Sequence, residues 1–143
     1  MATATAKRLR GYFQDLLGVR TGSEQKVVDL VEAGLPLSVL NRLMQRGLSK
    51  TELSGVIIPA RTLKHRKSKR QPLSKEESER AVRTIRILAT ANAVLGDDYS
   101  ALSWLRSPKK RFQDRAPIEM LATEPGGRLV EEMLIQIDEG MFA

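Results

Sequence analysis

The chain has 143 residues, no cysteine and one histidine, and its formal net charge is +7 with a pI near 10.1. These counts exclude disulfides, thiolate zinc sites and His-rich metal sites, and they remove the commonest nucleophile and base pairs of enzymes. We therefore expect no enzymatic activity, metal or cofactor. No apolar run approaches the roughly 18 residues needed to cross a bilayer, and the first residues lack a signal peptide's apolar segment, so we expect a cytoplasmic protein without a membrane partner.

The positive charge is concentrated in the first half of the chain. Residues 1–70 hold 14 basic and 5 acidic side chains, net +9, whereas residues 71–143 hold 10 and 12, net −2. A basic half favours a nucleic-acid partner, and a near-neutral half with an acidic end favours contact with a protein. The alternative is a solvated basic surface that binds no ligand.

Residues 1–22 are interpreted as an N-terminal arm. Tyr12, Phe13, Leu16 and Leu17 have helical spacing, which fits a flexible arm with one amphipathic turn. The sequence assigns no role to this arm.

Two short helices are predicted between the arm and residue 47. Thr21 and Glu24 have the spacing of a capping box, and the apolar face that follows ends at Gly34. Pro36 suits the first turn of the next helix, which ends before Gly47.

A helix, a tight turn and a second helix are predicted next. Ser49 and Glu52 have capping-box spacing and begin the first of these helices. The apolar run 56–58 is too short for a strand in this context and is expected to fill a core. Pro59 suits the first position of the second helix, which continues through Arg66.

This second helix carries most of the candidate DNA contacts. Leu63 is its one strong apolar anchor, and most other side chains are hydrogen-bond donors, as expected of a helix that enters the major groove. Arginine can read guanine, and threonine and lysine can hold phosphates. The predicted DNA-binding residues are Ser49, Lys50, Arg61, Thr62, Lys64, His65, Arg66, Lys67, Lys69 and Arg70. The alternative is a solvated charge run, and His65 lacks a nearby titratable partner for catalysis.

The longest predicted helix runs from a third capping box, Ser74 and Glu77, to Leu95. Gly96 closes this helix, which joins the two halves and is our candidate for a dimer surface. A homodimer is expected because one short recognition helix reads few base pairs.

The only tryptophan lies in a short helix that we expect to be buried. Asp98 or Ser100 can cap this helix, and the step from Ser107 to Pro108 ends it. A tryptophan buries roughly 150–250 Å², so a small domain tends to pack around it. The predicted structural core of this half is Trp104, Leu105, Pro117 and Leu121.

The last predicted helix covers residues 128–139, after a tight turn at Pro125-Gly126-Gly127, and Gly140 suits its C-terminal cap. Its apolar stripe is Val130, Met133, Leu134 and Ile137. Asp138 and Glu139 lie in its last turn, where the helix dipole disfavours each by about 0.3–1 kcal/mol. Such a local conflict can mark a surface kept for a partner.

These motifs resemble the Xre/MbcA/ParS family of antitoxins. Residues 58–66, together with the segment from Leu73 to Ser78 and Arg80, Arg83 and Arg86, resemble the N-terminal half of that family. The family's toxin-binding domain shows Phe-Gly-Asp, Ala-x-x-Trp-Leu, Pro-Leu-x-x-Leu and a last helix that ends in glycine. Here these motifs are residues 95–97, 101–105, 117–121 and 137–140, with Leu95 for the usual Phe and Ile118 for the usual Leu. The resemblance covers about residues 27–140.

The resemblance implies an all-α protein with an N-terminal Xre-like helix-turn-helix domain, residues 23–90, followed by a small helical toxin-binding domain, residues 91–143. It implies an antitoxin that covers the active site of a RES-domain toxin, an NAD-degrading enzyme, forms a hetero-oligomer with it and binds its own promoter DNA. Because a pocket for a diphosphate is cationic, the acidic chain end can occupy it as an anion mimic. The predicted toxin-binding residues are Glu124, Glu132, Asp138, Glu139, Gly140, Met141, Phe142 and Ala143. The alternative is a dimeric helix-turn-helix regulator whose second half only dimerises or senses a ligand.

Overall fold

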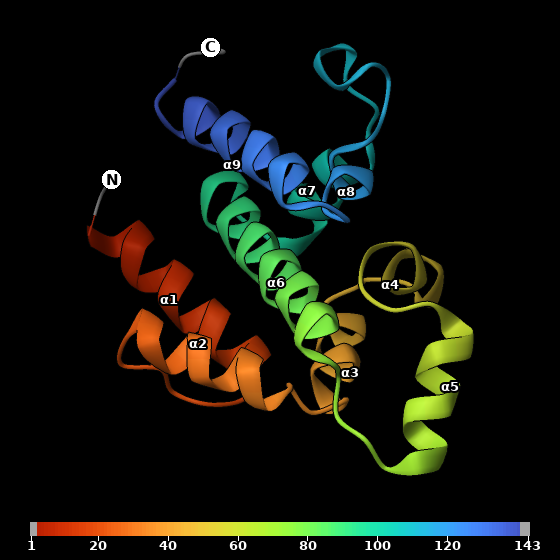
Figure 1. The fold of residues 1–143 in the computed structure, drawn as a ribbon. Helices are drawn as coiled ribbons and strands as arrows, with labels where there is room; N and C mark the ends of the chain where they lie inside the picture. The colour runs from red at the N-terminus through yellow and green to blue at the C-terminus, as the bar shows by residue number, and fades with distance from the viewer. Residues whose placement is uncertain (1–2, 141–143) are drawn as a thin grey trace.

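Helix α6 (Lys75–Leu95) is the central element of the computed structural model, which describes residues 3–140 (Figure 1). It begins with a complete capping box: the Glu77 amide donates to Ser74 Oγ, and the Ser74 amide donates to Glu77 Oε1. Twelve of its 21 residues are buried, and it packs against α1, α2, α3, α7 and α9. Because most of α6 is covered within its own chain, only its exposed N-terminal part, with Lys75, Glu76 and Glu79, remains open for the dimer contact that we predicted.

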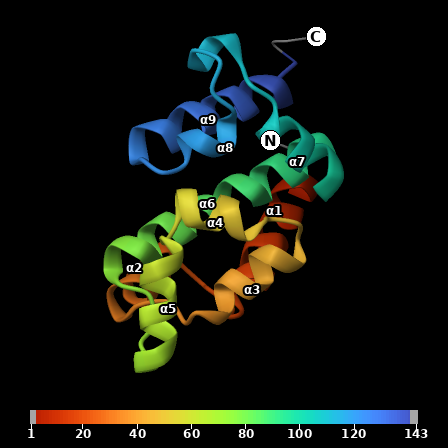
Figure 2. The ribbon, with the colours of Figure 1, turned by 90° about the vertical axis from the view of Figure 1, so that its right-hand side faces the viewer.

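The described residues are helical apart from their connections and one isolated β-bridge between Lys109 and Arg115, which confirms the all-α class. Besides α6, the helices are α1 (Thr3–Leu17), α2 (Glu24–Ala33), α3 (Ser38–Gln45), α4 (Lys50–Val56), α5 (Ala60–Lys69), α7 (Asp98–Arg106), the 3-10 helix η1 (Lys110–Phe112), α8 (Pro117–Met120) and α9 (Glu124–Asp138). Figure 1 shows α1 and α2 on one side of α6, and α4 and α5 on the other. The side view in Figure 2 places α8 and α9 at the end of the molecule opposite α5.

Residues 3–17 form a regular helix, so the prediction of a flexible arm is wrong for this segment. Tyr12, Phe13, Leu16 and Leu17 are buried in the common hydrophobic core. Their spacing lines one face of α1, and this face packs on α6 because neither helix can otherwise shield its apolar stripe from water.

Asp98, the first residue of α7, connects this helix to α1, α3 and α6. Its Oδ1 accepts hydrogen bonds from the Tyr12 hydroxyl at 2.6 Å and from Asn92 Nδ2 at 2.9 Å, and its Oδ2 lies 3.4 Å from Arg46 Nη1. Burial and the hydrogen bond to Asp98 raise the pKa of Tyr12 above its usual range. The prediction that Asp98 or Ser100 caps α7 is wrong, because Asp97 is the N-cap and accepts the capping bond from the Ser100 amide at 2.7 Å.

Three arginines on α6 each hold a different element. Arg80 Nε donates to the carbonyl of Ile57, between α4 and α5, at 2.8 Å. Arg83 Nη1 donates to the carbonyl of Leu121, after α8, at 3.1 Å. Arg86 Nη2 pairs with both carboxylate oxygens of Glu24, at the start of α2, at 2.9 and 2.7 Å.

The capping box that we predicted at Thr21 and Glu24 is absent. Ser23 is the N-cap of α2 and accepts from the Lys26 amide, so Glu24 is the first helical residue and not the reciprocal partner of Thr21. Two proline predictions are also displaced: Pro59 is the N-cap of α5, with Ala60 as its first residue, and Pro36 precedes α3, which starts at Ser38.

The prediction of a tight turn at residues 125–127 is wrong, because these residues form the first turn of α9. Thr123 is the N-cap and accepts a hydrogen bond from the Gly126 amide at 3.1 Å. A Cβ on Gly126 would lie 2.0 Å from the Met120 carbonyl oxygen, and one on Gly127 would lie 2.7 Å from Arg83 Cδ. The two glycines allow α9 to approach α8 and α6.

Trp104 is only half-buried, which contradicts the prediction that this residue is the buried centre of its domain. Leu105, Pro117 and Leu121 are buried, whereas the Trp104 ring lies at the edge of the core, 5.1 Å from Lys109 Nζ. Burial in this contact lowers the pKa of Lys109. The centre of the core is formed by leucine, isoleucine and valine side chains around α6.

Candidate functional site

Helices α4 and α5 form the predicted pair of helices joined by a tight turn. The capping box at the start of α4 is present: the Glu52 amide donates to Ser49 Oγ at 3.1 Å, and the Ser49 amide donates to Glu52 Oε1 at 2.9 Å. Ile57 and Ile58 are buried at the turn, each 1% exposed, as the short apolar run predicted. Helix α5 has no buried residue, so almost its whole surface is open to a ligand.

Most of the predicted DNA contacts lie on this open surface. Thr62 is half-buried, and Arg66 is half-buried as well. The exposed ones are Ser49, Lys50, Arg61, Lys64, His65, Lys67, Lys69 and Arg70. Helix α5 ends at Lys69, and its C-cap Arg70 adopts a left-handed conformation with a φ of 53°. The structure therefore presents a row of cations on a helix that projects from the body of the molecule (Figure 1).

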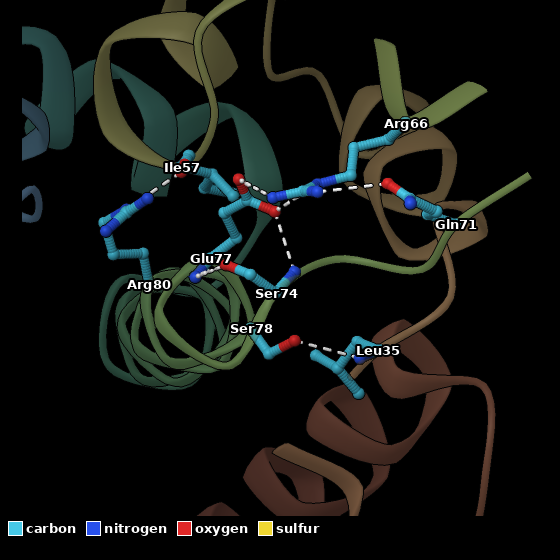
Figure 3. A network of polar contacts seen from close by, with 8 residues as sticks. All are labelled: Leu35, Ile57, Arg66, Gln71, Ser74, Glu77, Ser78 and Arg80. Carbon is cyan, nitrogen blue, oxygen red and sulfur yellow. Dashed lines mark hydrogen bonds and ion pairs between the residues drawn. The ribbon is translucent and has the colours of Figure 1, made fainter. Parts of the chain in front are cut away.

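Arg66 differs from the other cations of α5 because its guanidinium is engaged by other side chains of the protein. Figure 3 shows its guanidinium against Glu77 and Gln71. Nε and Nη2 lie 3.1 and 3.2 Å from the two carboxylate oxygens of Glu77, and Nη1 lies 3.2 Å from Gln71 Oε1. Arg66 thus attaches α5 to the start of α6, and its contact with DNA remains a prediction.

Glu77 was not identified from the sequence as more than a capping residue. Its side chain is 7% exposed. Burial alone would raise the pKa of Glu77, but the Arg66 guanidinium and the Ser74 amide outweigh this effect and hold the pKa below its usual value. The signal available in the sequence was the capping-box position of Glu77, but this position does not reveal which cation lies opposite.

The predicted protein-binding residues lie along α9 and at its end. Glu124, Glu132, Asp138, Glu139 and Gly140 are exposed. Glu124 pairs with Arg128 one turn later at 2.8 Å, so it is engaged within α9. Met141, Phe142 and Ala143 lie outside the described residues.

The end of α9 brings two carboxylates together at the negative end of the helix dipole. Asp138 is the last helical residue, Glu139 is the C-cap, and Gly140 follows with a φ of 77°. The dipole disfavours carboxylates at this position, as predicted. The same helix exposes Leu129 and Ile135, which are 47% and 39% exposed, so α9 offers a surface that is both acidic and apolar.

Within residues 3–140, no cluster of three or more His, Cys, Asp or Glu side chains is arranged to hold a metal ion. Across the same residues, no helix is both long and apolar enough to span a bilayer. The features that remain for function in this part of the chain are the basic helix α5 and the acidic surface of α9.

Comparison with known proteins assigns these two features to separate domains. Residues 26–86 match the antitoxin Xre-like helix-turn-helix domain, and residues 90–140 match the antitoxin Xre/MbcA/ParS C-terminal toxin-binding domain. The chain is 39% identical to an antitoxin Xre of Pseudomonas putida over 132 residues, which cover 92% of this chain and 83% of that protein. The chain belongs to the Xre antitoxin family. An antitoxin Xre of Yersinia enterocolitica is 27% identical over 141 residues, covering 96% of this chain and 95% of the relative.

Membership in the Xre family assigns α4 and α5 to a DNA-binding domain, and α7, α8 and α9 to a toxin-binding domain. Antitoxins of this family are not enzymes, in agreement with the expectation from the composition. The two matched segments meet near the end of α6. This helix therefore supplies core residues to both domains of the antitoxin.

Proposed function

We propose that this antitoxin neutralises a RES-domain, NAD-degrading toxin by covering its active site, and that it represses its own promoter through α5. The resemblance of the motifs to RES-associated antitoxins supports the choice of toxin. The observation that carries the neutralising role is the exposed pair of carboxylates at the end of α9, placed against the helix dipole. A cationic pocket for the diphosphate of NAD would relieve this unfavourable placement on binding.

The experiment for neutralisation is co-expression with the neighbouring reading frame. A variant that lacks residues 140–143 and carries Asp138→Asn and Glu139→Gln should lose neutralisation and toxin affinity while it still binds DNA. The matched control is Glu131→Gln, which removes an exposed carboxylate from the middle of α9. Unchanged neutralisation by the tail variant would rule out the anion-mimic mechanism, and loss by the control alone would move the toxin contact to the middle of α9.

The full chain is required for this experiment. A fragment of residues 91–143 would lack most of α6, on which α7 and α9 pack. Failure of such a fragment to protect cells would therefore report loss of folding and not loss of the toxin-binding surface.

The experiment for DNA binding uses the DNA that precedes the protein's own reading frame. Arg61→Ala should weaken binding by about 1–3 kcal/mol if Arg61 reads a base, and the loss should depend on sequence. Lys69→Ala should weaken binding to all DNA alike and lower the log-log salt slope by about one unit if Lys69 contacts a phosphate. Equal, sequence-independent losses in both variants would contradict base reading by Arg61.

The same measurements separate the proposed function from the alternative regulator. An antitoxin that blocks an enzyme loses neutralisation without its tail, whereas a domain that only dimerises or senses a ligand tolerates the truncation. We expect a homodimer on symmetric half-sites, because α5 has only ten residues and one such helix reads few base pairs.

A further inference from the structure

Arg106, the last residue of α7 in the toxin-binding domain, contacts the helix-turn-helix domain directly. Its Nε lies 2.8 Å from Glu52 Oε2, and its Nη2 lies 2.8 Å from Glu52 Oε1. The same Nη2 donates to the carbonyl oxygen of Gly47 at 2.8 Å. One guanidinium therefore contacts both the segment before α4 and the first turn of α4.

The Glu52 carboxylate is shared between two tasks. It accepts a hydrogen bond from the Ser49 amide as part of the capping box, and it pairs with Arg106 in a two-pronged geometry. Its side chain is 19% exposed, and the hydrogen bond from Arg106 is the largest cause that lowers the pKa of Glu52. Two parallel N–H···O bonds fix direction as well as distance, so the start of α4 has a defined orientation relative to α7.

The toxin-binding domain also packs directly against α4. Helix α4 packs against α8, and Leu53, Val56 and Ile118 line a small apolar space between the two helices. Figure 2 shows α4 between the α8 and α9 end of the molecule and α5. The position of α4 is thus set by elements that belong to the toxin-binding domain.

Helix α5 is connected to α4 by the short turn at residues 57–59 and is held to α6 by the side chain of Arg66. It has no buried residue, and an open groove of about 490 Å³ lies between α5, α3 and α4, with Leu63 and Met44 in its lining. The contacts that fix α5 are the pair Arg66–Glu77 and the buried turn at Ile57 and Ile58, whose Ile57 carbonyl accepts from Arg80. A change in the orientation of α4 would therefore be passed to α5 through this turn.

We propose that Arg106 is a positioning residue for DNA binding: through Glu52 and Gly47, the toxin-binding domain sets the orientation in which α4 and α5 meet DNA. This inference rests on the proposed DNA binding by α5. It makes the toxin-binding domain part of the DNA-reading unit, so that any partner that displaces the end of α7 changes the affinity for DNA.

The test compares Arg106→Gln with Arg128→Gln in the full chain. Arg128 is the matched control because it also forms an ion pair in the toxin-binding domain. Its partner, Glu124, lies on the same helix, and both side chains are more exposed than those of Arg106 and Glu52. The probe is a labelled duplex of the DNA that precedes the reading frame, titrated at several salt concentrations and at a temperature where all variants are folded. We expect R106Q to weaken binding by about fivefold or more. R128Q should stay within about twofold of the wild type, and R106K, which loses the two-pronged geometry, should fall between.

The salt slope distinguishes positioning from direct contact. R106Q should leave the log-log salt slope unchanged, because a positioning residue releases no counterions from DNA. A slope that falls by about one unit would show that Arg106 itself contacts a phosphate, and this would overturn the positioning role. Binding by R106Q within twofold of the wild type would also overturn it.

Hydrogen exchange provides a readout that is independent of DNA. Backbone amides of residues 49–70 should exchange faster in R106Q than in the wild type, while those of α1 keep their protection. Uniform acceleration through the chain would mean a general loss of stability and would contradict the proposal. If the wild-type protein binds no DNA, the proposed function fails, and the exchange data alone decide whether Arg106 positions α4.

Discussion

Helices α5 and α6 follow each other in the chain but are held in place by different forces. Helix α6 buries twelve of its residues at the junction of five other helices, whereas α5 buries none. Apolar burial places α6, while ion pairs and hydrogen bonds at its two ends place α5. The difference shows how a small protein can keep a helix largely exposed while its orientation stays fixed.

We expect the largest loss of stability when a buried side chain of α6 is truncated and leaves a cavity. Leu88 is 1% exposed, so Leu88→Ala should lower the free energy of unfolding by about 2–5 kcal/mol, as measured by urea denaturation. The control is Leu129→Ala in α9, where the side chain is 47% exposed and the effect should stay within about 0.5 kcal/mol. Because both domains share α6, the variant should unfold in one transition, and two separate transitions would contradict the shared core.

The next largest loss of stability is expected at the ion pair between Arg66 of α5 and Glu77 of α6. Glu77→Gln keeps an oxygen for the Ser74 amide but removes the charge that Arg66 faces, so the free energy of unfolding should fall by roughly 1–2 kcal/mol. Glu76→Gln, at an exposed position in the same turn, should cost no more than about 0.5 kcal/mol. Equal losses in the two variants would mean that the helix dipole, and not Arg66, accounts for the effect.

The contribution of Glu77 should depend on pH in a defined direction. The folded protein holds the pKa of Glu77 below its ordinary value of 4.5, so its contribution to stability is complete above pH 4.5 and is lost as the pH falls through the lower folded-state pKa. The difference in unfolding free energy between wild type and Glu77→Gln should be constant from neutral pH to about pH 5 and should shrink in more acidic solution. A difference that grows on acidification would contradict the lowered pKa.

A leucine-to-alanine substitution should lower the free energy of unfolding less in α5 than in α6. Leu63 is the main apolar contact of α5 and is half-buried, so Leu63→Ala should lower the free energy of unfolding by about 1 kcal/mol, less than Leu88→Ala. Urea denaturation of the two variants under identical conditions gives this comparison. A loss at Leu63 as large as that at Leu88 would show that α5 belongs to the core.

The smallest effect on stability is expected on the exposed face of α5. Arg61→Ala should change the free energy of unfolding by less than about 0.5 kcal/mol, because the side chain is exposed. Thermal denaturation of this variant, beside its DNA titration, separates function from folding. A stability loss comparable to that of Leu63→Ala would indicate that Arg61 supports the fold.

Local signals in the sequence predicted much of this fold. The capping boxes at Ser49 and Ser74 are present, and the glycine at position 96 ends α6 as expected. These features involve residues within four positions of each other, so their geometry follows from the local sequence alone. The order of the helices and the basic exposed surface of α5 could be predicted for the same reason.

The failed predictions concern contacts between residues far apart in the chain. Glu24 pairs with Arg86 and is not part of a capping box, and the pairing of Arg66 with Glu77 was not predicted. The two glycines of α9 are required by close helix packing, which a local reading takes for a turn. The position of Trp104 at the edge of the core also depends on tertiary packing, because hydrophobicity alone does not state how much of a ring is covered.

The contact between Tyr12 and Asp98 has a consequence for biosynthesis. These residues are 86 positions apart in the sequence, and α1, the first helix to be made, packs mainly on α6. At about 5–20 residues per second, ribosomal synthesis separates them by roughly 4–17 s. During this interval α6 cannot cover the apolar face of α1. A chain whose synthesis stops before α6 is complete keeps much of this face exposed to chaperones and proteases.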